Sequence, residues 1–171
     1  MENKRKKKRS EQEMLYTLTA MCASAEHCSY EIRDYLRKWE ATNAEQERII
    51  DYLVKEKYID NERYCRAFVR DKIRYNKWGE RKVNQALYMK LIPKEIRNKV
   101  LSEVSDDEYL EVLRPLIKQK DKTLKDENRY ERNGKLIRFA LSRGFTMDLI
   151  RQCVDDEGYE DLDNEDEEGM L

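Results

Sequence analysis

Residues 64–87 read YCRAFVRDKIRYNKWGERKVNQAL, and their pattern of apolar and basic residues decides the fold class. At 100° per residue, Tyr64, Cys65, Phe68 and Val69 fall on one side of a helical wheel, with Ile73 at its edge. An apolar stripe with this spacing is typical of a helix that buries one face. The stretch therefore predicts an amphipathic helix in an all-α protein.

The opposite side of this helix is almost purely basic. Five cations lie there within about 80° of one another: Arg63, Arg66, Arg70, Arg74 and Lys77. A helix face that only meets solvent usually mixes charges of both signs, with acidic and basic residues four positions apart. In this stretch only Asp71 and Glu80 interrupt the basic residues. We therefore expect the apolar side to face inward and the cations to be bare to water, although a plain solvated face remains the alternative.

Helix boundaries follow from residues on both sides of this stretch. Asp60 is a suitable N-cap, because its side chain can accept hydrogen bonds from the first free N–H groups. Trp78 and Gly79 mark a break, after which a second helix covers roughly residues 80–90. Pro93 suits the first position of a third helix, where its missing N–H is unpaired in any case.

The same apolar pattern recurs along the chain, which indicates internal repeats. The pairs that correspond are Ile32 and Leu36, Val83 and Leu87, and Leu136 and Ala140, with offsets of 51 and 53 residues. The WEATNA turn after Leu36 reads as longer than its counterparts. Small helical units share a core when they stack, so we expect an elongated, curved array of three tandem three-helix repeats.

The domain boundaries are predicted from these repeats and from the charge runs at both ends. We expect a disordered basic segment over residues 1–13, repeats over 14–59 and 60–105, a connector helix with the third repeat over 106–157, and a disordered acidic segment over 158–171. Residues 106–132 read as a charged, helix-rich connection. Within it, Pro115 is expected to kink or restart the helix.

The formal net charge of −1 conceals a strong asymmetry. Residues 4–9 read KRKKKR, residues 64–99 carry eleven basic against three acidic side chains, and from Asp155 onward ten acidic residues occur without a basic one. The basic head can add non-specific attraction to phosphates, and the acidic tail can compete with nucleic acid for a basic surface. Solubility alone explains both tails equally well.

Several functional classes are disfavoured by the sequence. The one histidine, His27, has no nucleophile motif beside it, and no glycine-rich phosphate loop is present, so we expect no enzyme and no cofactor. Cys22, His27 and Cys28 lack the paired ligands of a structural zinc site, so we expect no metal. Without a signal peptide or an 18-residue apolar segment, a reducing cytoplasm is the expected location and a membrane role is not expected.

Two groups of short motifs carry a resemblance to a known family. They are Ile59-Asp60-Asn61-Glu62-Arg63-Tyr64, Arg66-Ala67-Phe68-Val69-Arg70, Lys77-Trp78-Gly79 and Lys90-Leu91-Ile92 in the middle of the chain, and Ser142-Arg143-Gly144-Phe145 with Leu149-Ile150 near its end. Over roughly residues 28–157 the sequence resembles the RecX family of bacterial regulatory proteins. The resemblance implies three tandem three-helix repeats and binding to the RecA recombinase filament on single-stranded DNA. It also implies inhibition of that filament's ATPase, strand-exchange and co-protease activities.

Charge, rather than a family motif, selects the residues expected to meet the partner. We call them the cationic surface: Arg66, Arg70, Arg74, Lys77, Arg81 and Lys82. We expect a monomer that contacts the RecA filament, and single-stranded DNA only weakly or indirectly. Two other functions fit the same residues. One is a direct helical nucleic-acid-binding protein, and the other is a helical-repeat scaffold for an acidic protein partner.

Overall fold

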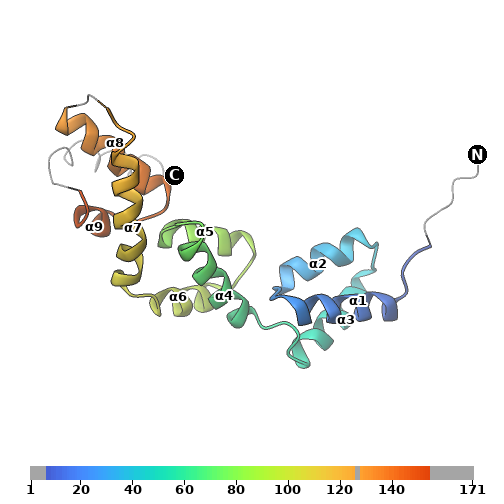
Figure 1. The fold of residues 1–171 in the computed structure, drawn as a ribbon. Coiled ribbons are helices and arrows are strands. Elements are labelled where there is room, and N and C mark those ends of the chain that lie inside the picture. The colour runs from blue at the N-terminus through green and yellow to red at the C-terminus, as the bar shows by residue number, and fades with distance from the viewer. Residues whose placement is uncertain (1–6, 126–127, 155–171) are drawn as a thin grey trace, which may run out of the picture. The chain divides into compact units, whose positions relative to one another are not determined.

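The computed structural model describes residues 7–125 and 128–154, and every regular element within these ranges is an α-helix (Figure 1). The all-α prediction is thereby confirmed. The helices are α1 (Glu11–Ser24), α2 (Ser29–Lys38), α3 (Asn43–Lys55), α4 (Asn61–Arg74), α5 (Glu80–Met89), α6 (Lys94–Ser102), α7 (Asp106–Asp121), α8 (Arg129–Ser142) and α9 (Met147–Arg151).

The chain divides into two compact units. Unit 1 comprises residues 1–68 and 87–100, and unit 2 comprises residues 69–86 and 101–171. The division passes through α4 and α5, so that each of these helices contributes residues to both units.

The core of unit 1 is built by α1, α2 and α3. Met14 and Leu18 from α1, Ile32 and Leu36 from α2, and Ile49, Ile50 and Leu53 from α3 form one buried cluster. Helix α3 packs against both α1 and α2. The apolar positions Ile32 and Leu36, identified from the repeated pattern, are therefore confirmed as core residues.

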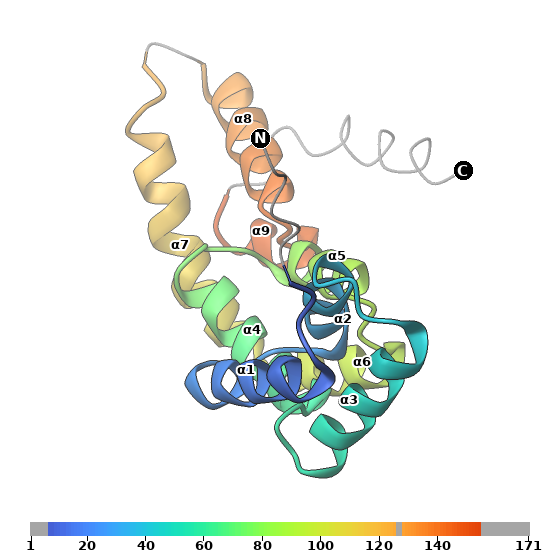
Figure 2. The same ribbon diagram turned by 90° about the vertical axis from the view of Figure 1, so that its right-hand side faces the viewer.

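The core of unit 2 includes α7, α8 and α9, which pack against one another (Figure 2). Leu113 on α7, Ile137 on α8 and Ile150 on α9 are fully buried. The expectation that residues 106–132 form mainly a connection is wrong, because α7 supplies Leu110, Leu113 and Ile117 to this core. The apolar residues of α7 have the spacing of a core helix, but the many charged residues between them made this pattern hard to recognise in the sequence.

Two further expectations about helix boundaries need correction. A restart at Pro115, one of the two alternatives expected there, does not occur, because α7 continues through this residue. The predicted disordered segment over residues 1–13 is too long, since α1 begins at Glu11. Ser10 caps α1, because its side chain accepts a hydrogen bond from the Glu13 backbone while the Glu13 carboxylate accepts one from the Ser10 N–H. Residues 1–6 and 155–171 lie outside the described residues.

Helices α2, α5 and α8 end in the same way. Glu40, Leu91 and Gly144 each have a positive φ, of 59°, 55° and 90°. The residue after each one donates its backbone N–H to a carbonyl five positions earlier, in the pairs Ala41 to Leu36, Ile92 to Leu87 and Phe145 to Ala140. This is the Schellman pattern, which satisfies carbonyls that the helix end leaves free.

This shared ending confirms the offsets of 51 and 53 residues and corrects one detail. The sequence WEATNA suggested that the turn after Leu36 is longer than its two counterparts. In the structure it has the same length, because the N–H donor follows the carbonyl acceptor by five positions in all three turns. The length of this turn was misjudged because Glu40 adopts the left-handed conformation, which in a sequence is usually marked by a glycine.

Candidate functional site

Helix α4 has the predicted orientation over most of its length. Tyr64, Cys65, Val69 and Ile73 are buried. Phe68, which was placed on the same inward side, is only half-buried, and its ring centroid lies 5.8 Å from that of Tyr64. Asp60 caps the helix as predicted, since its Oδ1 accepts hydrogen bonds from the N–H groups of Glu62 and Arg63, both at 3.0 Å.

The first two cations of α4 are not bare. Arg63 donates to the Glu26 carboxylate and to the backbone carbonyl of Lys57. Arg66 donates to Glu62, which also accepts from Lys99 at 2.7 Å. Hydrogen bonds from Lys99 and Arg66 hold the pKa of Glu62 below its usual value. The prediction of an uninterrupted row of free cations is therefore wrong at its N-terminal end, within unit 1.

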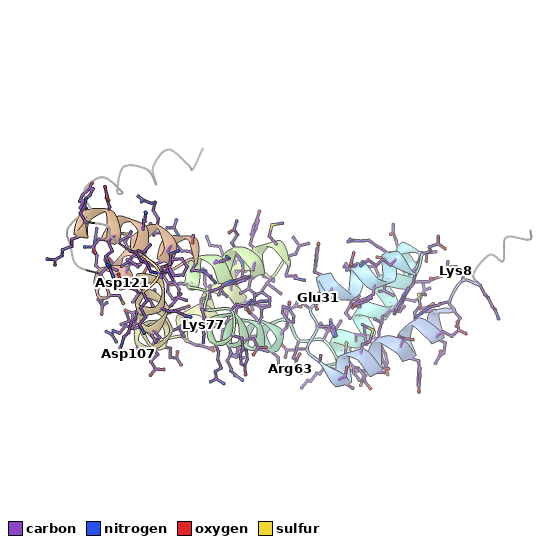
Figure 3. The ribbon with its side chains drawn as sticks, turned by 45° about the horizontal axis from the view of Figure 1, so that its top comes forward. Lys8, Glu31, Arg63, Lys77, Asp107 and Asp121 are labelled. Carbon is purple, nitrogen blue, oxygen red and sulfur yellow. The ribbon has the colours of Figure 1, made fainter. Side chains whose placement is uncertain are left out.

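The remaining cations of the surface lie in unit 2 and have no carboxylate partner among the residues that the structure describes. Arg70 and Arg74 on α4 and Arg81 on α5 are exposed, and none of them forms an ion pair with any residue in 7–125 or 128–154. Lys77 follows α4 with a φ of 58°, and its Nζ donates to the Arg74 carbonyl (Figure 3). Here the predicted exposure of the guanidinium groups is confirmed.

Two lysines lie over the ring of Trp78 at the turn between α4 and α5. The Nζ atoms of Lys72 and Lys82 lie 5.0 and 4.9 Å from the centroid of its ring. Amino groups over an indole are attracted by the negative potential of its face. Lys82 was expected at this surface, whereas Lys72 was missed, because only the turn geometry brings it to Trp78.

Tyr75 was also missed as part of this region. Its side chain is 72% exposed. It follows Arg74 directly in the chain and lies two residues before Lys77. An exposed aromatic ring among free cations can stack on a planar group while the cations contact charges beside it.

A close approach of two glycines fixes this turn within unit 2. The N–H of Gly79 donates to the Arg143 carbonyl at 2.8 Å, and the N–H of Arg81 donates to the Gly144 carbonyl at 3.0 Å. A Cβ on Gly79 would lie 2.4 Å from the Phe145 nitrogen, and one on Gly144 would lie 2.4 Å from the Lys82 Cβ. The turn that carries Lys77, Arg81 and Lys82 is thus attached to the turn between α8 and α9.

Two further cations of unit 2, which the sequence did not indicate, lie near the ring of Phe139. The Arg143 guanidinium lies 5.2 Å from the centroid of the Phe139 ring, and the Lys120 Nζ lies 5.4 Å from it. The motifs Lys77-Trp78-Gly79 and Ser142-Arg143-Gly144-Phe145, far apart in the sequence, therefore form one structural feature.

The exposed cations of this arrangement can bind anions. Guanidinium forks accommodate carboxylates and phosphates in the same planar geometry. Within residues 7–125 and 128–154 no group of three or more histidine, cysteine or acidic side chains could hold a metal ion. In the same part of the chain, no helix combines the length and apolarity needed to cross a membrane.

Comparison with known proteins shows what this arrangement belongs to. Residues 60–101 match the family model described as "RecX, second three-helix domain", and residues 106–154 match "RecX, third three-helix domain". A crystal structure of RecX from Lactobacillus salivarius superimposes with a TM-score of 0.76 at 18% identity, covering 90% of this chain and 97% of that one. Another RecX crystal structure gives 0.74 at 16% identity, covering 83% and 73%. These structures show the shared fold.

Curated relatives carry the name "Regulatory protein RecX". The protein of Listeria monocytogenes is 30% identical over 144 residues, which is 82% of this chain and 52% of the relative. That of Clostridium beijerinckii is 27% identical over 126 residues, or 72% and 58%, and that of Vibrio campbellii is 28% identical over 138 residues, or 81% and 85%. The chain spans about half the length of several of these relatives. Because the two family models together match more than half of its residues, the chain belongs to the RecX family of regulatory proteins.

Proposed function

We propose that this chain regulates a RecA recombinase by binding the filament that the recombinase forms on single-stranded DNA. Binding lowers the ATPase, strand-exchange and co-protease activities of the filament and so modulates recombination and DNA repair in the cytoplasm. Membership of a family of regulatory proteins supports the regulatory role. An elongated, curved array of repeats, which stays a prediction, would suit the groove of such a filament.

The observation that carries the proposal is the set of free arginines in unit 2. Arg70, Arg74 and Arg81 are exposed and have no carboxylate partner among the described residues. A partner that brings carboxylates or phosphates need not first break an internal ion pair, so the whole electrostatic attraction is available for binding. Lys77 and Lys82 extend the same positive region.

Arg66 takes a smaller part in the proposed contact. Its guanidinium already donates to Glu62, which also binds Lys99. An incoming anion would have to replace this carboxylate, and the gain from the new contact would be reduced by the loss of the old one. We therefore expect Arg66→Ala to weaken partner binding less than Arg70→Ala does.

Recombinase ATP hydrolysis on single-stranded DNA tests the proposal. Wild-type chain should inhibit hydrolysis at a substoichiometric ratio to the recombinase. The variant Arg70→Glu/Arg74→Glu/Arg81→Glu should lose most of this inhibition, because three attractive contacts become repulsive. The matched control is Arg37→Glu/Lys55→Glu/Lys94→Glu, which makes the same change in charge at exposed positions of α2, α3 and α6. Thermal melting of both variants shows whether they fold.

Each outcome of this assay has a distinct meaning. If wild-type chain leaves hydrolysis unaltered at every concentration, regulation of the recombinase is wrong. If both triple variants inhibit as well as wild type, the function stands but the cationic surface is not the contact. If both lose inhibition equally, net charge rather than this surface is responsible.

Direct binding of nucleic acid is the second candidate, and Tyr75 is the observation that favours it. Its exposed ring among free cations is the combination that single-strand-binding surfaces use for bases and phosphates. Fluorescence anisotropy of a labelled single strand, without recombinase, distinguishes the candidates. Tight binding that Tyr75→Ala weakens by about 1–3 kcal/mol would favour direct binding. A scaffold for an acidic protein partner would show neither this binding nor inhibition of the recombinase.

A further inference from the structure

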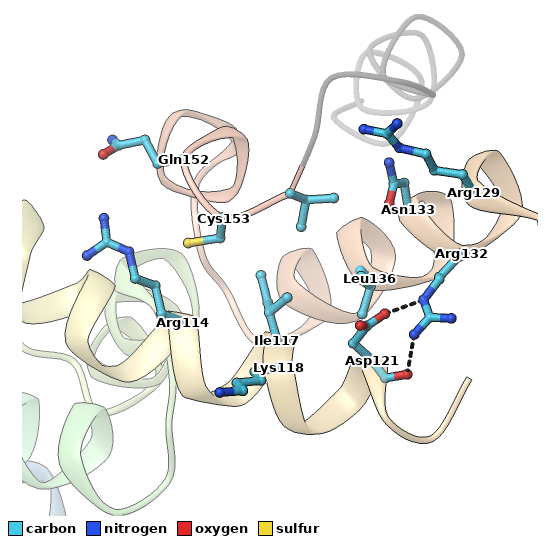
Figure 4. A pocket seen from close by; sticks show the side chains of 11 residues that line it. Arg114, Ile117, Lys118, Asp121, Arg129, Arg132, Asn133, Leu136, Gln152 and Cys153 are labelled. Atoms are coloured by element: carbon cyan, nitrogen blue, oxygen red, sulfur yellow. Dashed lines mark hydrogen bonds and ion pairs between the residues drawn. The ribbon is translucent and has the colours of Figure 1, made fainter. Parts of the chain in front are cut away.

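A second basic feature in unit 2 has no part in the proposed function. It is a hollow of about 500 Å³ lined by α7, α8 and the residues after α9 (Figure 4). None of the six residues of the cationic surface is among its lining residues.

The charges around this hollow are unbalanced. Among the described residues that line it are four cations, Arg114, Lys118, Arg129 and Arg132, and one carboxylate, Asp121. Asp121 is already engaged, because it accepts a hydrogen bond from Arg132 Nε, and this bond holds its pKa below the usual value. Arg114 and Lys118, one turn apart on α7, form no ion pair with any of the residues that the structure describes. The hollow therefore has positive charge that the described residues do not neutralise.

Apolar side chains also line the hollow. Ile117, Leu136 and Val154 are among its lining residues, beside the charged groups. A site for a small inorganic anion has little use for such side chains, whereas a peptide that carries both carboxylates and apolar groups can use the cations and the apolar side chains together.

The chain itself supplies a peptide of this composition at the same place. Val154 lines the hollow, and the next three residues are Asp155, Asp156 and Glu157. From Asp155 to the end there are ten acidic residues and no basic one, and Tyr159 and Leu162 lie among them. Three extended residues reach about 10 Å, so the first carboxylates are tethered within reach of the cations.

We propose that this hollow is an acidic-peptide site and that its resident occupant is the chain's own segment beginning at Asp155. A short tether gives an effective concentration on the order of millimolar, so weak individual contacts suffice to keep the site occupied. The occupied site neutralises Arg114 and Lys118 and makes them unavailable to other polyanions. The inference concerns this chain alone and does not depend on the recombinase.

Zero-length crosslinking of the full chain tests the docking. A carbodiimide joins a lysine amine to a carboxylate only when the two are in contact, and mass spectrometry identifies the pair. We expect crosslinks between residues 155–168 and Lys118 in wild type, several-fold above those to Lys77 or Lys82. They should disappear in Lys118→Arg, which keeps the charge but has no primary amine, and fade at 1 M salt, where charges are screened within about 3 Å.

A matched pair of variants separates docking from mere proximity along the chain. Arg114→Glu removes a cation of the hollow but keeps Lys118 as the reporter, and we expect it to reduce the Lys118 crosslinks several-fold. Arg37→Glu makes the same change in charge on α2 in unit 1 and should leave them unchanged. Equal yields in wild type and Arg114→Glu would show tethering without a site and would overturn the proposal.

Two other results would also overturn it. Crosslinks concentrated on Lys77 or Lys82 would place the acidic segment on the cationic surface instead. Crosslinks between isotopically distinct chains in a mixed sample would make the contact intermolecular. Amide NMR spectra give an independent measurement, because changing all ten acidic residues to their amides should shift the lining residues of α7 and α8, and an absence of shifts there would contradict the docking.

Discussion

At the scale of single residues, Gly144 shows why one position of a repeat tolerates only glycine. Its equivalents Glu40 and Leu91 also have a positive φ, so the left-handed conformation alone does not demand glycine. The difference is the Lys82 backbone, whose nitrogen would lie 2.5 Å from a Cβ on Gly144. The close approach of α5 thus adds a steric requirement to a conformational one.

We expect Gly144→Ala to lower the free energy of unfolding by more than about 2 kcal/mol, because a left-handed alanine costs about 1–2 kcal/mol and the overlap with Lys82 adds to it. Urea denaturation measures the change. Gly134→Ala is the matched control: its Cβ would meet only the Arg138 side chain, at 3.6 Å, inside α8. Here alanine should raise stability by about 0.5–1 kcal/mol. Equal effects of the two changes would contradict the proposed approach of the two turns.

Glu31 is a second residue whose environment can be tested. Its Oε1 accepts from Tyr64 at 3.0 Å and from Lys90 at 3.1 Å, and its Oε2 lies 3.0 Å from Nδ1 of His27. Burial raises the pKa of Glu31, but the hydrogen bonds from Lys90, Tyr64 and His27 outweigh it and hold the pKa below the ordinary value of a glutamate. All four residues belong to unit 1.

The stability that Glu31 contributes should therefore depend on pH. A carboxyl group with a lowered folded-state pKa stabilises the fold above its unfolded pKa, and this contribution is lost as the pH falls through the folded value. At pH 7, Glu31→Gln should lower the free energy of unfolding by about 1.5–3 kcal/mol. The difference from wild type should shrink as the pH falls below about 4.5. A difference that stays constant from pH 7 to pH 3 would show that the charge of Glu31 does not contribute to stability. The control is Glu56→Gln, a change of the same kind at an exposed position.

At this scale the sequence predicted burial well and ion pairs poorly. The inward positions of Tyr64, Val69 and Ile73 follow from their spacing within one helix. The pairing of Arg63 with Glu26 does not, because the two residues are 37 positions apart and only the folded backbone brings them together. Free and paired arginines look alike in a sequence, which is why the cationic row was predicted to be longer than it is.

At the scale of elements, the endings of α2, α5 and α8 show that the repeats were predictable. Offsets between apolar positions gave the correct pairing of helices, and the hydrogen bonds at the helix ends agree with it. Helix α7 was harder to predict, because its buried positions alternate with charged residues and a proline lies within it. Packing against α8 and α9, rather than local preference, stabilises it as a helix.

Pro115 offers a test of this last point. Proline has no N–H to donate to the Glu111 carbonyl, and within a helix it costs about 3 kcal/mol relative to alanine. It also restricts the unfolded chain, which offsets up to about 1 kcal/mol of this cost. Pro115→Ala should therefore raise the free energy of unfolding by about 2 kcal/mol, measured by urea denaturation. A loss of stability would indicate that α7 requires the proline ring at this position.

The C-terminal half of α4 and the start of α5 carry a prediction about salt. If Arg70, Arg74 and Arg81 contact phosphates of a single strand, each contributes about 0.7 to the slope of log binding constant against log salt concentration. Changing all three to alanine should then reduce that slope by about 2, measured by anisotropy over a range of sodium chloride concentrations. The control Arg63→Ala removes a paired arginine of the same helix and should leave the slope nearly unchanged. Equal slopes for wild type and the triple variant would mean that these arginines do not contact phosphate.

At the scale of the whole molecule, the net charge of −1 is a balance between a basic middle and an acidic end. Composition alone suggests a nearly neutral protein with no preference for polyanions. The unpaired cations of the cationic surface nevertheless form a locally positive region. The ten acidic residues from Asp155 onward offset this positive charge in the total. Family membership was predictable from motifs in the middle and the last third of the chain, whereas the basic hollow was not, because its cations come from two helices and no motif links them.

This balance leads to a prediction for the intact chain. Changing all ten acidic residues from Asp155 onward to their amides moves the formal net charge from −1 to +9. Affinity for single-stranded DNA at low salt should rise on the order of tenfold, since the molecule loses ten negative charges that repel the phosphates. The advantage should vanish near 1 M salt, where the screening length is about 3 Å. A chain whose last 17 residues are scrambled keeps their charge and should bind as wild type does, because the repulsion depends on charge and hardly on order. Unchanged affinity of the amide variant at low salt would show that the acidic residues lie too far from the cations to influence binding.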